Sequence, residues 1–207
     1  MLDKDLKNAQ HGLTVIEEDL GSVSKILARQ LGGYAKTEGR RVVVLSLTVQ
    51  DPQDVASESE RLHGVAATRD AGSRGISPGA QVFGGGLMAV LLGGAGYDLM
   101  VVEGFSGFLF DKTDREVVDA LKQMTRLTDQ GKSFIVTFES SLVGEKTAAY
   151  IRAAADTVIQ IRTELVGTRI DRMLYVRKMK DLMPPDRLIK ITVDQAGVQV
   201  DTREFVG

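Results

Sequence analysis

Short apolar runs alternate along this chain with segments in which apolar residues recur at helical spacing. The runs predict strands at 14–16, 42–47, 99–102, 134–138 and 158–161. Continuous apolar strands with helices between them are typical of a parallel sheet that is covered on both faces. The pattern therefore predicts an α/β fold with a mostly parallel central sheet.

Helical periodicity occupies the segments between these strands. It predicts helices at 25–35 and 114–128 and a weaker one at 53–62. The pattern is clearest in 114–128, where Thr113 and Glu116 have the spacing of a capping box. Gly131 follows as a helix stop signal. We expect this segment to be a regular helix with both ends defined by local residues.

The pattern changes after Asp156, where strand-like runs follow one another with little helix between them. These runs are 158–161, 173–176, 189–193 and 198–200. Strands joined by short connections pair antiparallel. We therefore predict an antiparallel extension on one edge of the parallel sheet. No linker or repeat divides the chain, so residues 1–207 are expected to form a single domain.

Composition excludes several classes of function. The chain has 207 residues, 43% of them hydrophobic, and a formal net charge of −2. It has no cysteine and two histidines, so neither a disulfide framework nor a zinc site is expected. The longest apolar stretch, 84–96, is too short to span a bilayer. Near-neutral charge and 5% aromatic residues do not favour nucleic-acid binding. We expect a cytoplasmic protein whose partners are other proteins.

Residues 69–96 contain nine glycines. One interpretation is a surface loop followed by a small-residue helix at 87–92 that packs closely on the sheet. The alternative is a displaced anion site, because glycine-rich backbone can surround a phosphate. A glycine pattern alone does not decide between these two interpretations.

The stretch "VIEEDLGSVSKILARQL" predicts a strand, a loop and then a helix. That is the setting of a phosphate-binding P-loop, yet the pattern G-x-x-x-x-G-K-[ST] is absent. The order of elements resembles the RecA-like ATPases, specifically their KaiC-like branch. "YDLMVVEG" resembles its Walker B strand, and "DQGKSFIVTFES" resembles its fourth core strand. The C-terminal segment from "AADTVIQIRTELVGTRIDRMLYVRKMK" to "IKITVDQAGVQVD" resembles its terminal meander.

This resemblance covers nearly the whole chain and implies a RecA-like three-layer sandwich. The group within the branch that the chain most resembles is the archaellum accessory ATPases of archaea. The nucleotide motifs are where it departs. On the family pattern, Glu18 takes the first glycine, Gly21 a middle position, Val23 the second glycine, Ser24 the lysine and Lys25 the Ser/Thr.

Each of these changes opposes triphosphate binding. Val23 places a branched side chain where the pattern has glycine, and Ser24 is too short to reach the β- and γ-phosphates. Glu18 places a negative charge beside a polyanion, which at ~4 Å costs several kcal/mol even with surface-like screening. Lys25 lies one residue further on, so it is rotated by roughly 100° around the helix.

Other motifs are also weakened. Glu103 stands at the Walker B aspartate position, and "SLTVQD" supplies no carboxylate at 48–50 where the family activates water. The resemblance with these losses implies a catalytically inactive ATPase homologue without cofactor, catalytic residue or metal. Its role would be regulatory or in assembly, in archaeal signalling or surface-filament machinery. The alternative is an ATPase that binds ATP and magnesium through an altered loop built from Lys25 and 72–86.

Lys178 and Lys180 match a late lysine-x-arginine pair. Ring-forming members of the branch insert this pair into a neighbouring subunit's phosphates. The resemblance therefore implies trans-acting fingers, and a homo-oligomer or an intact ATPase relative as partner. The alternative is a basic strand edge, since lysine commonly protects such edges. We also expect Glu103 to end the strand next to the Glu17–Lys25 loop, and Glu18 or Glu103 to pair with Lys25.

Overall fold

The computed structural model describes residues 6, 8–19, 21, 23–47, 96–109, 112–185 and 187–201. A mixed sheet of eight strands runs through this part of the chain. The strand order is β2-β3-β4-β1-β5-β6-β7-β8. The strands are β1 (Leu13–Glu18), β2 (Val42–Ser46), β3 (Leu99–Glu103), β4 (Ser133–Glu139), β5 (Thr157–Val166), β6 (Arg169–Met179), β7 (Ile189–Asp194) and β8 (Gly197–Val200). The glycine-rich stretch and the predicted helices at 53–62 and 87–92 lie outside the described residues.

The pairing confirms a parallel sheet with an antiparallel extension. β2, β3, β4, β1 and β5 pair in parallel, and β6, β7 and β8 continue the sheet antiparallel. β1, β3 and β4 are buried along their full length, as their continuous apolar runs predicted. Glu103 ends a strand as expected, namely β3. The expectation that this strand lies next to β1 is wrong, because β4 separates β3 from β1.

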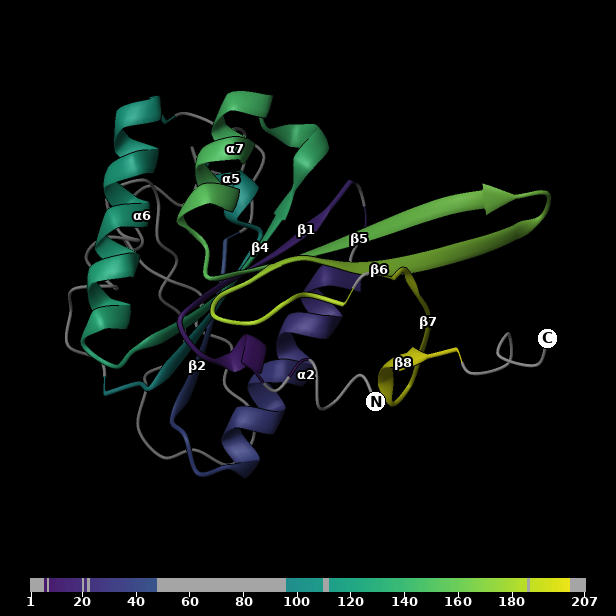
Figure 1. The fold of residues 1–207 in the computed structure, drawn as a ribbon, viewed down its shortest axis with the longest axis horizontal. Helices are drawn as coiled ribbons and strands as arrows, with labels where there is room; N and C mark the ends of the chain where they lie inside the picture. Colours follow the sequence, from purple (N-terminus) through teal and green to yellow (C-terminus); the bar gives the residue numbers. More distant parts are fainter. Residues whose placement is uncertain are drawn as a thin grey trace, which may run out of the picture.

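Helices cover both faces of the sheet and complete three layers (Figure 1). They are α2 (Val23–Thr37), α5 (Phe105–Leu109), α6 (Asp114–Asp129) and α7 (Glu145–Ala154), with short 3-10 turns η1 (Asn8–Gln10) and η2 (Ser140–Leu142). α5, α6 and α7 lie on one face, and α2 lies on the other with β6 to β8 curling toward it (Figure 1). Each face has its own apolar core, one around Phe105 and Met124 and the other around Leu27 and Leu174.

The local signals of α6 are confirmed. The Thr113 side chain accepts from the backbone N–H of Glu116, and the Glu116 carboxylate accepts from the backbone of Thr113. Gly131 has a φ of 84°, a left-handed conformation that suits glycine after a helix end. The ends of α6 are thus determined by residues within one turn of them.

Two helices and one hairpin differ from the prediction. α5 and α7 were not predicted, and in α7 only Ala148 and Ile151 are buried, which is too short an apolar stripe to stand out. β5 and β6 extend well past the predicted 158–161 and 173–176 and form a projecting hairpin (Figure 1). The outer residues of this hairpin alternate only weakly between apolar and polar, so the sequence pattern did not predict the outer parts of the two strands.

Candidate functional site

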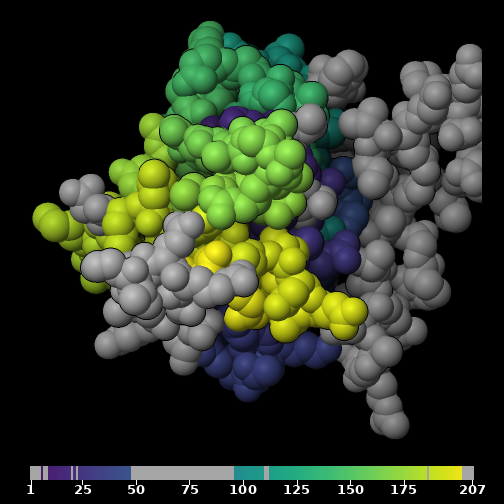
Figure 2. Space-filling model, turned by 90° about the vertical axis from the view of Figure 1, so that its right-hand side faces the viewer, coloured from purple at the N-terminus to yellow at the C-terminus, as the bar shows by residue number. Residues whose placement is uncertain are grey.

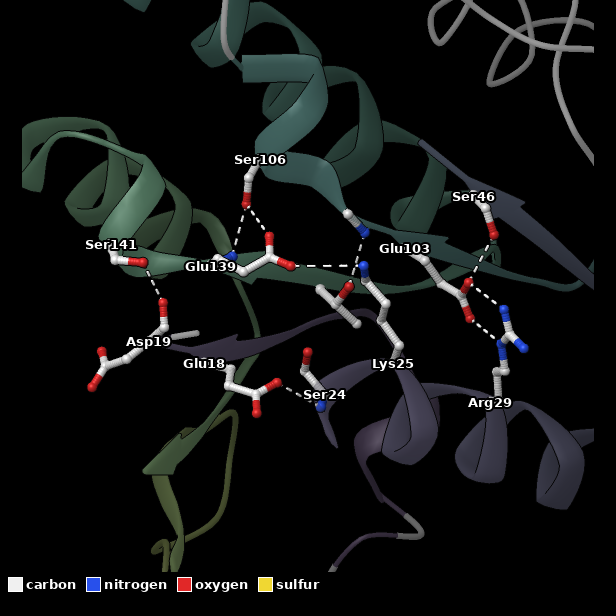
Figure 3. Close-up of polar contacts among 12 residues, drawn as sticks. Glu18, Asp19, Ser24, Lys25, Arg29, Ser46, Glu103, Ser106, Glu139 and Ser141 are labelled. Atoms are coloured by element: carbon white, nitrogen blue, oxygen red, sulfur yellow. Dashed lines mark hydrogen bonds and ion pairs between the residues drawn. The ribbon is translucent and has the colours of Figure 1, made fainter. Parts of the chain in front are cut away.

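Three glutamates stand at the ends of the central strands. Glu18, Glu103 and Glu139 are the last residues of β1, β3 and β4, which lie side by side in the order β3-β4-β1. Parallel strands place their carboxyl ends at one edge of the sheet, where open α/β folds bind ligands. α2 runs from this edge, and its first turns face the three carboxylates (Figure 3). This edge is the candidate site.

The side chain of Glu18 lies at the N-terminus of α2. It is 1% exposed, and its Oε2 accepts a hydrogen bond of 2.9 Å from the backbone N–H of Ser24. Gly21 has a φ of 152°, and a Cβ there would clash with the Glu18 carboxylate. The Glu18 carboxylate therefore lies against both Gly21 and the backbone of Ser24, and Figure 3 shows its contact with Ser24. Glu18 Oε1 and Ser24 Oγ are buried and have no hydrogen-bond partner within the described residues.

Lys25 faces Glu139, so the expectation of a pair with Glu18 or Glu103 is wrong. Its Nζ lies 3.8 Å from Glu139 Oε1, and the lysine side chain is 38% exposed. Ser106, at the start of α5, donates to the other Glu139 oxygen at 2.6 Å and accepts from the Glu139 backbone at 2.7 Å. β4 adjoins β1, so its last residue lies nearer to Lys25 than Glu103 does.

Glu103 is paired with Arg29 instead. The guanidinium donates to both carboxylate oxygens, with Nη2 2.8 Å from Oε2, and the Ser46 hydroxyl donates to Oε2 at 2.7 Å. Glu103 is 2% exposed, so it needs such a counter-charge. The hydrogen bond to Glu103 raises the pKa of Arg29, with burial opposing it. Both oxygens of Glu103 are thereby engaged within the chain.

Glu17 forms a second bidentate pair on the opposite face of β1. Arg152 of α7 donates to its two oxygens at 2.9 and 2.6 Å and also contacts Glu145 at 2.7 Å. Glu17 is 1% exposed, and the Arg152 side chain is 20% exposed. The hydrogen bonds to Glu17 raise the pKa of Arg152. This pair joins α7 to the strand that carries the site.

Sequence reasoning did not select Arg29, Ser46, Ser106, Glu139 or Arg152. Arg29 carried one usable signal, because it lies four residues after Lys25 and so on the same side of the helix. The others come from elements far away in the chain, and only the strand order brings them together. Within the described residues, no group of three His, Asp or Glu side chains could hold a metal ion.

The two predicted finger lysines lie at the other end of the sheet. Lys178 of β6 is paired with Val158 near the start of β5, and Val158 is paired with Val15 in the first half of β1. The Lys178 ammonium donates to the Ala153 and Ala155 carbonyls at the end of α7. Lys180 pairs with Asp156 at 3.1 Å, which raises the pKa of the lysine. Neither lysine reaches this chain's own candidate site.

Comparison with solved structures identifies the fold. The flagellar accessory protein FlaH from Methanocaldococcus jannaschii matches with a TM-score of 0.66 and 14% identity over 97% of this chain and 94% of that one. A KaiC-like protein from Pyrococcus horikoshii OT3 matches with a TM-score of 0.66 and 16% identity over 92% and 89%. The chain has a KaiC-like RecA fold. No protein-family profile matches it, and neither does any curated protein.

These identities establish a shared fold and leave function to the residues of this chain. The predicted α/β class, with a parallel sheet and an antiparallel C-terminal extension, is confirmed. The described part of the chain contains no helix that is both long and apolar enough to cross a membrane.

Proposed function

We propose that this protein is a catalytically inactive homologue of the KaiC-like ATPases with a regulatory or assembly role. The observation that carries this proposal is the position of Glu18. Its buried carboxylate accepts a backbone N–H at the start of α2. In a P-loop these N–H groups bind phosphate, because a helix N-terminus favours negative charge. The protein's own carboxylate supplies that negative charge here.

The remaining charges at this edge support the same proposal. Arg29 engages both Glu103 oxygens, which leaves this carboxylate no free oxygen for a magnesium ion. Lys25 faces Glu139 rather than the Glu18 loop. Val23 is buried in the first turn of α2, where the P-loop pattern has glycine. The residues present therefore do not fit ATP and magnesium as cofactors.

We expect the purified protein neither to bind Mg-ATP at millimolar concentration nor to hydrolyse it. Glu18 would have to leave the helix N-terminus before a phosphate entered, and two like charges ~4 Å apart repel by about 4 kcal/mol at an effective dielectric of 20. Isothermal titration calorimetry measures binding, and phosphate release measures turnover. Micromolar binding that Lys25→Ala abolishes would contradict this and favour an ATP-binding enzyme with an altered phosphate loop.

An intact ATPase relative is the proposed partner, because a second copy of this chain would have no bound phosphate for the lysines to contact. Lys178 and Lys180 lie at the sheet end opposite the candidate site, so any phosphate that they contact would belong to another subunit. Their present contacts with α7 and Asp156 would be exchanged on docking. Lysine is a point charge without arginine's bidentate fork, so its effect on a phosphate would be the weaker of the two.

Stimulation of an intact relative tests this role of the lysines. We expect wild-type protein to raise the ATPase rate of an intact KaiC-like relative from the same organism, and the Lys178→Ala/Lys180→Ala variant to lose that stimulation. Arg177→Ala removes a neighbouring exposed charge from the same strand and serves as the matched control. Equal stimulation by all three proteins would show that the lysines only cap α7 and protect the strand edge.

A further inference from the structure

The hairpin of β5 and β6 projects beyond the rest of the sheet. β1 pairs with β5 only as far as Ile161, and β7 pairs with β6 only from Arg172 to Leu174. Residues 162–171 therefore form a ribbon of two strands, here called the β5–β6 arm. Figure 1 shows the arm extending past the helices, and in Figure 2 the same hairpin faces the viewer. Every residue from 162 to 170 is exposed.

The end of the arm carries exposed aliphatic side chains on both faces. Leu165, Val166 and Ile170 are 74%, 52% and 52% exposed. Leu165 lies opposite Ile170 and Val166 opposite Arg169, so these residues form the last two rungs of the ribbon. Successive strand residues point to opposite faces, which places Leu165 and Ile170 on one face and Val166 on the other. Both faces thus present large aliphatic side chains to water.

Positive charge lies behind this apolar tip. Asp171 is already paired with Arg169 at 2.8 Å and with Lys190 at 3.5 Å. The rung next to the tip pairs Glu164 with Asp171, and Arg172 and Arg162 occupy the two rungs after it, toward the body. Arg172 is two residues from Ile170, which corresponds to ~7 Å along a strand. The arm therefore carries an apolar tip that extends ~7 Å beyond an arginine band.

We propose that the β5–β6 arm docks the protein on an anionic lipid surface. Interfacial segments bury their apolar side chains ~5–10 Å into the headgroup and acyl boundary, which matches the length of the tip. Arginines behind the tip would lie at the level of the lipid phosphates, where cations are attracted. A flat protein surface would cover only one face of the ribbon, whereas lipid surrounds the tip on both. The proposal rests on the arm alone and is independent of the proposed loss of ATP binding.

Co-sedimentation with vesicles tests the proposal. We expect the full-length protein to sediment with phosphatidylcholine–phosphatidylglycerol vesicles much more than with phosphatidylcholine alone, and less as salt is raised. Leu165→Ser/Ile170→Ser should weaken binding by at least ~10-fold, because it removes most of the apolar area of the tip. Leu142→Ser, which changes an exposed leucine of η2 (61% exposed), is the matched control and should bind as the wild type does. Circular dichroism checks that each variant folds.

Three outcomes would overturn the proposal. The wild type could fail to sediment with anionic vesicles at low salt. The arm variant could bind as tightly as the Leu142→Ser control does. Finally, light scattering could show a wild-type oligomer that the arm variant dissociates while no vesicle binding occurs. That last result would assign the arm to contact between copies of this chain.

Discussion

Replacing Glu18 by glycine is expected to create an anion-binding site that the wild-type protein lacks. The substitution removes the carboxylate that accepts from the Ser24 backbone and leaves the N-terminus of α2 open. Free N–H groups at a helix N-terminus bind anions readily. We expect the affinity for inorganic phosphate and pyrophosphate to rise at least ~10-fold, because the like-charge repulsion of a carboxylate at ~4 Å is relieved. Calorimetric titration of each anion measures the change.

Two further variants distinguish anion binding at the N-terminus of α2 from a general effect of reduced negative charge. Asp19→Asn removes a negative charge from the same loop, where Asp19 is exposed and accepts from the Ser140 hydroxyl at 2.8 Å. It leaves Glu18 in place and should gain no affinity. Glu18→Gln keeps the volume of the side chain in the loop and should gain less than Glu18→Gly does. Loss of such a cap costs ~1 kcal/mol of stability, so the variants should remain folded.

Equal gains in Glu18→Gly and Asp19→Asn would mean that anions respond only to overall charge. Absence of any gain in Glu18→Gly would mean that the start of α2 is not a latent phosphate site. Either result would remove the main support for the proposed loss of an ancestral nucleotide site. The vesicle experiment on the β5–β6 arm would be unaffected.

Truncation of Arg152 is expected to cause the largest loss of stability among these variants. Arg152→Met leaves the Glu17 carboxylate, which is 1% exposed, without its bidentate partner. Removing one member of a buried ion pair typically costs ~3–5 kcal/mol, because an uncompensated charge stays buried. Since the Arg152 side chain is 20% exposed, we expect a loss of about 3 kcal/mol in the free energy of unfolding. Urea unfolding measures it.

A surface arginine and a double variant complete this test. Arg115→Met on α6 removes a side chain that is 93% exposed and lies 4.0 Å from Asp119, so it should change stability by less than ~0.5 kcal/mol. Glu17→Gln together with Arg152→Met removes both charges and should recover a substantial part of the loss. If Arg152→Met proved as mild as Arg115→Met, the pair would not be what holds α7 to β1.

The core strands and α6 were predictable because their signals are local. A parallel strand that is covered on both faces is mostly apolar, so β1, β3 and β4 are visible as apolar runs, although each ends in glutamate. Thr113 and Glu116 are three residues apart and define the start of α6 without help from the rest of the fold. α7 was missed because only two of its residues, Ala148 and Ile151, are buried, and two residues carry little periodicity.

The sequence alone also showed that the pattern G-x-x-x-x-G-K-[ST] is absent at 18–25, where Glu18, Val23 and Ser24 stand. Only the tertiary structure decided what their side chains contact. Arg152 and Glu17 are 135 residues apart, and Lys25 meets Glu139 because β4 lies between β1 and β3. Periodicity reports which face of an element is buried, but the partner of a buried charge depends on which strand lies beside it, and strand order is set by packing of the whole sheet.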